Sequence, residues 1–131
     1  PVVRPGGSVY LELHAVRRQG VPGPIEVEFP RLPPGVTASR GVLHPGQEKS
    51  FVVLTAAPDA TPGGYVRTLP VATATVGGKR VTRPTIPYEV RSHCRAVPRR
   101  DEVVVTVGAA ADWGVTAEAG GPLAPGGSVE V

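Results

Sequence analysis

The sequence predicts an all-β protein folded as an antiparallel β-sandwich, and three observations lead to this prediction. Short segments alternate between apolar and polar residues, with the period of two that marks a strand buried on one face. The 17 glycines and 16 prolines gather in clusters between those segments, where a β-protein needs its turns. No segment shows the length and spacing of a helix. A chain of 131 residues is long enough to bury one core without disulfides.

Five strands are expected in the larger, N-terminal part of the chain. Gly77 and Gly78 predict a two-residue hairpin, because adjacent glycines supply the positive φ that a type I′ turn needs. Pro84 and Pro87 mark the strand after this hairpin as an edge or bulged strand, since proline has no N–H to donate. The expected strands are 8–18, 25–29, 51–55, 65–76 and 79–90.

The alternation also predicts which residues form one core between two sheets. Segment 30–37 is too rich in proline for a central strand, and we expect Leu32 and Val36 to reach the core from it. The run 51–54 is apolar on both faces, so this strand is expected to be covered on each side. The strand residues expected in the core are Leu11, Leu13, Val27, Phe29, Phe51, Val53, Tyr65 and Val71.

Pro-Gly pairs occur between the expected strands. Proline presets φ at the second position of a turn and glycine permits positive φ at the third, so each pair is a candidate type II turn. The pairs begin at Pro5, Pro22, Pro34, Pro45, Pro62 and Pro125.

The order of four turn motifs in this sequence resembles that in a known family. In chain order they are Pro-Gly-Gly-Ser at 5–8, Leu-Pro-Pro-Gly-Val-Thr at 32–37, Pro-Gly-Gln at 45–47 and Ala-Thr-Pro-Gly-Gly-Tyr at 60–65. This order resembles bacterial immunoglobulin-like domains found beside glycosidases and in large exported proteins, including the alpha-galactosidase-associated type. The resemblance covers about residues 4–90 and implies an immunoglobulin-like antiparallel β-sandwich. It further implies a non-catalytic spacer, adhesive or accessory module, with Tyr65 as a buried tyrosine corner.

The pentapeptide Pro-Gly-Gly-Ser-Val occurs twice, at 5–9 and again at 125–129. This repeat predicts a piece of a longer repeating protein. We interpret 1–91 as one immunoglobulin-like sandwich, 92–101 as a linker and 102–131 as the start of a second repeat.

The repeat leads to a prediction about the C-terminal segment. The first sheet would lack its opening strand, and an uncovered strand edge readily accepts another segment. We expect 102–107, with 112–119 as a further candidate, to pair in that gap. Pairing would occur within the same chain or by exchange into a second copy, which makes a dimer. The alternative is that this segment is a disordered overhang or forms its own small sheet.

The sequence contains no pattern typical of a catalytic or metal site. His14, His44 and His93 are widely spaced, and none belongs to a ligand motif. His93 and Cys94 are neighbours, but adjacent residues on a strand point to opposite faces. A single cysteine excludes an internal disulfide and a multi-cysteine zinc site. We therefore expect no enzymatic activity, no cofactor and no metal.

Three aromatic residues make up the one candidate ligand platform. Trp113 follows Asp112 on a weakly predicted strand and could stack on a sugar ring, together with Tyr10 or Tyr88 if these share an exposed face. The alternative for Trp113 is a core anchor or a contact between modules.

The net charge of +3 does not predict a nucleic-acid partner. The densest group of arginines lies in 91–100, without interleaved aromatic residues, and two acidic residues follow it directly. No stretch approaches the ~18 apolar residues of a membrane-spanning segment, so membrane insertion is not expected either.

Two functional hypotheses remain. The first is a structural or interaction module of a larger exported or surface-associated bacterial protein, located extracellularly, in the periplasm or at the cell surface. Its partners would be neighbouring repeats of the same protein, with possible self-association by strand exchange. The second is an accessory module that binds carbohydrate or another polymer for a secreted hydrolase on the same chain.

Overall fold

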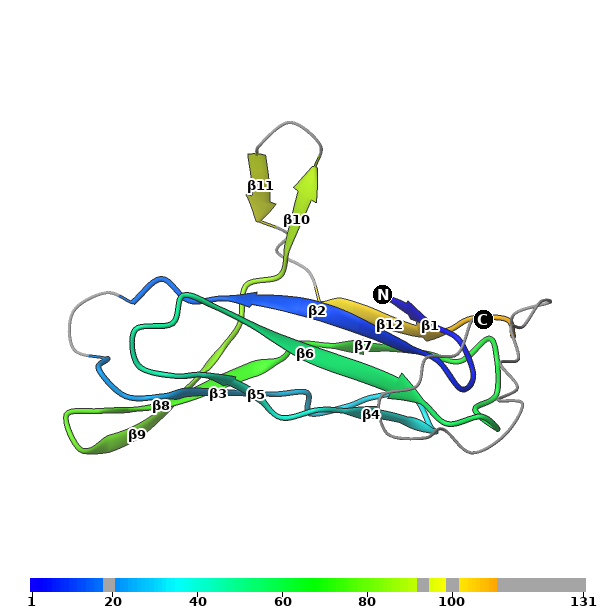
Figure 1. The fold of residues 1–131 in the computed structure, drawn as a ribbon, viewed down its shortest axis with the longest axis horizontal. Helices are drawn as coiled ribbons and strands as arrows, with labels where there is room; N and C mark the ends of the chain where they lie inside the picture. The colour runs from blue at the N-terminus through cyan, green and yellow to red at the C-terminus, as the bar shows by residue number, and fades with distance from the viewer. Residues whose placement is uncertain (18–20, 92–94, 99–101, 111–131) are drawn as a thin grey trace, which may run out of the picture.

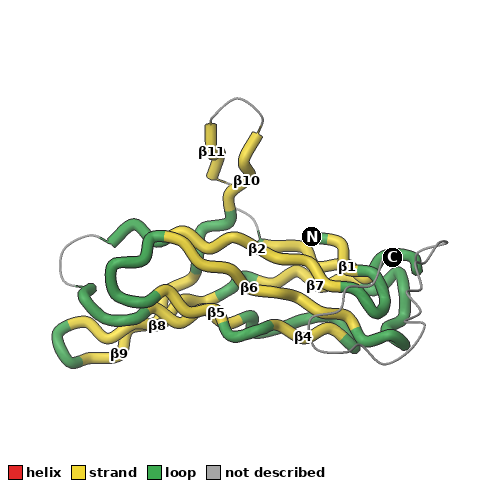
Figure 2. Tube along the Cα trace, viewed as in Figure 1, coloured by secondary structure: helices red, strands yellow, loops and turns green. Residues whose placement is uncertain are grey.

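The computed structural model describes residues 1–17, 21–91, 95–98 and 102–110, and all regular secondary structure in them is strand (Figures 1 and 2). The all-β class predicted from the sequence is thus confirmed. None of the described residues belongs to a helix that could span a membrane. The strands are β1 (Val2–Val3), β2 (Ser8–His14), β3 (Ile25–Glu28), β4 (Val36–Ala38), β5 (Gly41–Leu43), β6 (Lys49–Ala56), β7 (Tyr65–Thr68), β8 (Val71–Val76), β9 (Lys79–Pro84), β10 (Tyr88–Arg91), β11 (Arg95–Pro98) and β12 (Val103–Val107).

The strands form a sandwich of two layers. One layer is the antiparallel sheet β2-β6-β4. The other contains the sheets β1-β12-β7 and β5-β3-β8-β9. Only Leu69 and Pro70 separate β7 from β8, so these two sheets continue into one another. The pairing of β1 with β12 is parallel, and the other described pairings are antiparallel, as the sequence predicts for a sandwich.

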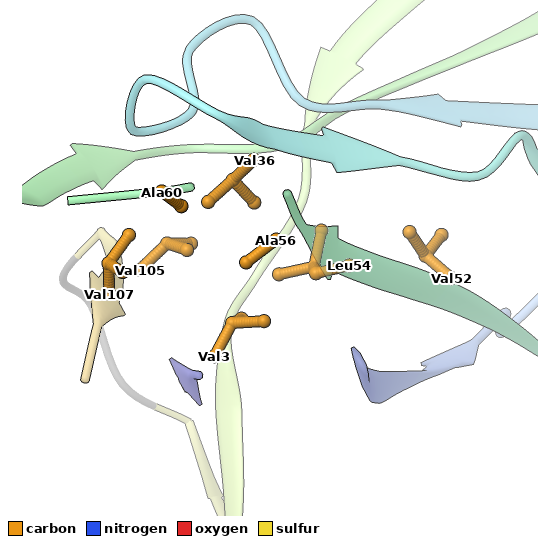
Figure 3. Close-up of a cluster of buried hydrophobic side chains, with 8 residues drawn as sticks. All are labelled: Val3, Val36, Val52, Leu54, Ala56, Ala60, Val105 and Val107. Atoms are coloured by element: carbon orange, nitrogen blue, oxygen red, sulfur yellow. The ribbon is translucent and has the colours of Figure 1, made fainter. Parts of the chain in front are cut away.

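The main core lies between β6 and the β1–β12 pair (Figure 3). Strand β6 sends every second side chain inward, and β12 does the same from the facing layer. The buried residues of this cluster are Val3, Val36, Val52, Leu54, Ala56, Ala60, Val105 and Val107.

The sequence prediction placed the wrong face of β6 in the core. Phe51 and Val53 lie on the outer face and are exposed, whereas Val52 and Leu54 are fully buried. The outer face of this strand is therefore open, and the expectation of cover on both sides is wrong. Because a one-residue shift exchanges the two faces of a strand, a run that is apolar on both faces does not specify its own register.

The remaining core predictions are confirmed, with one exception. Tyr65 is 64% exposed, so it is not the buried tyrosine corner that the family resemblance implies. In β7 the alternation buries Thr68 and half-buries Val66, which leaves Tyr65 on the outside. The predicted core residues that are buried or half-buried are Leu11, Leu13, Val27, Phe29, Leu32, Val36 and Val71.

The turn predictions are confirmed at most described positions. Gly77 and Gly78 have φ of 55° and 77°, and Val76 pairs with Lys79 across them, as a type I′ hairpin requires. Of the five described Pro-Gly pairs, the pair at 22–23 lacks a glycine with positive φ. The four pairs that have one contain Gly6, Gly35, Gly46 and Gly63.

Strand β12 pairs within its own chain. It is antiparallel to β7 and parallel to β1. This is one of the two arrangements expected for 102–107, but the position differs, because β12 lies beside β7 and not at the edge of β2. Val2 and Val3, which the repeat interpretation left without a role, form the first strand. The further candidate, 112–119, lies outside the described residues.

The return strand after the Gly77-Gly78 hairpin is interrupted. If the pairing of β9 with β8 continued in the same register along β7, Pro87 would lie opposite Thr68. The residue opposite Thr68 is instead Val103, which comes sixteen residues after Pro87 in the sequence. Between the two parts the chain leaves the sandwich and forms the hairpin β10–β11, which projects from it (Figure 1). Residues 95–98 are therefore a strand inside the segment expected to be a linker.

Arg17 forms hydrogen bonds with both the loop before β3 and the end of β5. Its guanidinium donates hydrogen bonds to the carbonyl oxygens of Val21 (3.0 Å) and Gly23 (2.6 Å). It also donates to the carbonyl oxygens of Leu43 (3.0 Å) and His44 (2.8 Å). Hydrogen bonds from a charged donor are stronger than neutral ones, so this side chain ties the loop to the end of β5 just beyond the ladder pair Ile25–Leu43.

Strands β5 and β6 approach each other closely at Gly41. A Cβ at this position would lie 2.5 Å from Cγ2 of Val52 and 3.1 Å from Cδ1 of Leu13. Both of these side chains pack in or against the core, so neither is free to move aside.

We expect Gly41→Ala to lower the free energy of unfolding by about 1–3 kcal/mol, because it overpacks a filled space. Gly23→Ala is the matched control, since no heavy atom lies within 4 Å of the Cβ that it would add. Urea unfolding of both variants measures the difference. Equal effects of the two substitutions would contradict the close approach at Gly41.

Candidate functional site

Two exposed aromatic rings meet on the outer face of the β2–β6 pair. Alternation along β2 turns Val9 and Leu11 inward and Tyr10 outward. Tyr10 is 68% exposed and Phe51 is 53% exposed. Their ring centroids lie 5.7 Å apart with the planes at 82°, an edge-to-face contact. Val53 stands directly opposite Tyr10 in the ladder and extends this apolar patch.

The same face continues toward the end of β2 with a polar cluster. Oε1 of Glu12 lies 3.1 Å from Nε2 of His14 and 3.5 Å from Nζ of Lys49. The ring of His14 meets Tyr88 edge to face, with centroids 5.3 Å apart. We call the rings along this face, namely Tyr10, Phe51, His14 and Tyr88, the aromatic strip.

Two groups in or beside the polar cluster, Glu12 and Tyr88, have shifted pKa values. The pKa of Glu12 is lowered from 4.5, chiefly because the carboxylate accepts a hydrogen bond from His14, with further attraction from Lys49. The pKa of Tyr88 is raised from 10.0 by burial, to which the nearby charge of Glu12 adds. Both shifts move the pKa further from neutral pH, where Glu12 is charged and Tyr88 is neutral.

A groove of about 860 Å³ lies next to the polar cluster, between β2 and the start of β12. We call it the inter-sheet groove. Its walls come from both layers of the sandwich and from the segment that leads into β10. The apolar side chains that line its interior include Leu11, Leu13, Ile25, Val27, Phe29 and Leu43.

Two of the three residues predicted as a ligand platform lie near strand β2, Tyr10 on the strand itself and Tyr88 against His14 at its end. Tyr10 and Tyr88 lie at the two ends of the aromatic strip, connected through Phe51, Glu12 and His14. Trp113 lies outside the described residues, so its part in a platform stays a prediction. His93 and Cys94 lie outside them as well.

Sequence analysis missed Phe51 and the cluster around Glu12. Phe51 was assigned to the core because its strand is apolar on both faces, and the polar residues of β2 were interpreted only as the solvent side of a strand. The alternation over 8–14 did contain the signal, because it places Tyr10, Glu12 and His14 on one face. The alternation does not identify the partner strand, β6, which places Phe51 opposite Glu12.

The exposed rings can stack on a flat or apolar ligand, and Glu12 can accept hydrogen bonds from it. Groups of three or more histidine, cysteine, aspartate or glutamate residues that could hold a metal do not occur in the described part of the chain.

We expect the stability of the protein to depend on pH through Glu12. Its pKa is lowered in the folded state, so its contribution is present above pH 4.5 and is lost as the pH falls through the folded pKa. Glu12→Gln should therefore make the loss of stability in acid shallower. Urea unfolding midpoints at about pH 3 and about pH 6 measure this slope.

Glu28→Gln is the control for that experiment, because it removes an exposed carboxylate from another strand, away from this cluster. If both variants lose stability in acid as steeply as the unmodified protein, the interaction of Glu12 with His14 and Lys49 does not contribute to folding.

Comparison of the chain with protein-family models, with curated proteins and with solved structures finds no match.

Proposed function

We propose that the chain is a non-catalytic, immunoglobulin-like structural and interaction module of a larger exported or surface-associated protein. Neighbouring modules of the same protein are its proposed partners. The support comes from the sandwich itself and from a turn whose sequence recurs later in the chain.

The observation that carries the proposal is the structural role of the repeated pentapeptide at 5–9. The N–H of Gly7 donates to the carbonyl of Arg4 at 2.8 Å, which closes a turn with Gly6 at φ 71°. The N–H of Gly6 donates to the carbonyl of Ala57 at 3.2 Å. This turn leads the chain from β1 in one layer to β2 in the other. The same pentapeptide recurs in the sequence at 125–129, outside the described residues, and this recurrence supports the proposal of a second module.

An accessory polymer-binding module is the second candidate, and the exposed contact between Tyr10 and Phe51 favours it. Exposed aromatic rings offer a flat apolar face on which a sugar ring can stack. The patch is small, and its neighbours on the strands are the Ser8–Thr55 hydroxyl pair at one end and the charged cluster at the other.

Sedimentation with insoluble cellulose, chitin and peptidoglycan separates the two functions. The structural module predicts that the full chain stays in the supernatant and that Tyr10→Ala and Phe51→Ala change nothing. If the full chain sediments with one polymer and both variants bind that polymer at least about tenfold more weakly, the accessory module is the function and the proposal is overturned. Thr37→Ala, at an exposed position on the neighbouring strand β4, is the matched control.

A further inference from the structure

Strand β2 has one open edge. It pairs with β6 alone among the described strands. The N–H of Ala15 donates to the carbonyl of Glu48 at 2.9 Å, and the N–H of Ala56 donates to the carbonyl of Gly7 at 3.0 Å. Antiparallel ladders exchange hydrogen bonds at alternate residue pairs, so the odd-numbered residues of β2 face β6.

The even-numbered residues of β2 therefore turn their backbone groups the other way. Tyr10, Glu12 and His14 present their N–H and C=O groups to the open edge, in a row with the spacing of a strand. Such a row is a template for one more strand.

The inter-sheet groove lies along this open edge. It is lined by residues 11–16, from the second half of β2 onward, and on the facing side by Glu102, Val103 and Val104. Leu11, Leu13 and Phe29 are only half-buried there, although they pack against the core. Apolar side chains of an added strand would complete their burial.

The facing wall of the groove continues the line of the β1–β12 ladder. The N–H of Thr106 donates to the carbonyl of Pro1 at 3.1 Å, and the N–H of Gly108 donates to the carbonyl of Val3 at 2.9 Å. By the same alternation Val104 turns its backbone groups toward the side of β12 on which β1 lies.

The charge of the groove indicates the chemistry of its occupant. Its described lining contains two carboxylates, Glu12 and Glu102, and no lysine or arginine side chain. Lys49 contacts Glu12 from β6, on the outer face of the sheet. An occupant with alternating apolar side chains and basic ends would match both the interior and the rim.

We propose that the inter-sheet groove binds an extended peptide segment of another protein, which adds as a strand to the open edge of β2. The backbone of the segment pairs with Tyr10, Glu12 and His14, alternate side chains enter the groove, and basic residues face Glu12 and Glu102. This inference goes beyond the proposed function, because a module can act as a structural unit without this interaction.

The test uses the full chain and a fluorescein-labelled peptide of seven residues, in which valine and threonine alternate between a lysine at each end. Fluorescence anisotropy should show saturable binding. A peptide with proline in place of each threonine should bind at least about tenfold more weakly, because it lacks the backbone donors.

Glu12→Pro removes one N–H from the open edge without removing a donor to β6, and should weaken binding of the valine-threonine peptide at least about tenfold. Arg80→Pro is the matched control. The N–H of Thr85 donates to the carbonyl of Pro70 at 2.8 Å, so by alternation the N–H of Arg80 points to the open side of β9, away from the groove. This variant should bind as the unmodified protein does.

Hydrogen exchange of the unmodified protein is a second measurement that does not depend on a variant folding. The amides of Tyr10, Glu12 and His14 should exchange fast without peptide and slow down at least about tenfold with it. Absence of binding, or binding without this protection, would overturn the proposal. Protection that rises with protein concentration in the absence of peptide would also overturn it, because a second copy would then occupy the edge.

Discussion

Packing of the valine face of β12 against β6 is the interaction on which the sandwich depends. Val105 and Val107 are almost completely buried, as are Val52 and Leu54 of β6, and Val3 belongs to the same cluster from β1. Full burial of one such side chain contributes about 1.5–3 kcal/mol. Three valines from β1 and β12 thus contribute an amount comparable to the whole stability of a small domain, which is about 5–15 kcal/mol. Without these two strands, part of the inner face of β6 would meet water, while Val52 would keep its cover from β5 at Gly41.

This dependence explains how β12 tolerates an insertion of sixteen residues before it. The entropy cost of closing a longer loop grows only with the logarithm of its length, while the side chains gained beyond it are fully buried. The inserted residues also pair with one another in β10 and β11, so their backbone groups have partners outside the sandwich. The insertion therefore leaves the ladder of β12 with β7 intact.

The parts of the fold that local chemistry determines were predictable from the sequence. Gly77-Gly78 and four Pro-Gly pairs adopt the expected turns, because φ is set by the residues themselves. The inner face of β2 follows from alternation, and so does the inward position of Leu32 and Val36 in the proline-rich segment, although Val36 begins strand β4. For the candidate site, alternation correctly placed Tyr10 on the outer face of its strand.

The parts that depend on distant partners were not predictable. Phe51 and Val52 are both apolar, and only the facing layer decides which of them is buried. Strand β12 pairs with Tyr65–Thr68 and Val2–Val3, which are distant from it in sequence, and no pattern within 103–107 identifies these partners. The same holds for the contact of His14 with Tyr88, which arises because the insertion starts beside the end of β2.

The most direct test of the role of β12 compares Val105→Asp with Val104→Asp in the full chain. Val105 is fully buried, whereas Val104 is 42% exposed on the other face of the same strand. Urea unfolding should show a loss of more than about 3 kcal/mol, or of the cooperative transition, for Val105→Asp, because a carboxylate cannot be buried there without a partner. Val104→Asp should cost less than about 1 kcal/mol. Equal tolerance of both substitutions would contradict the account, since β12 would then not pack against β6.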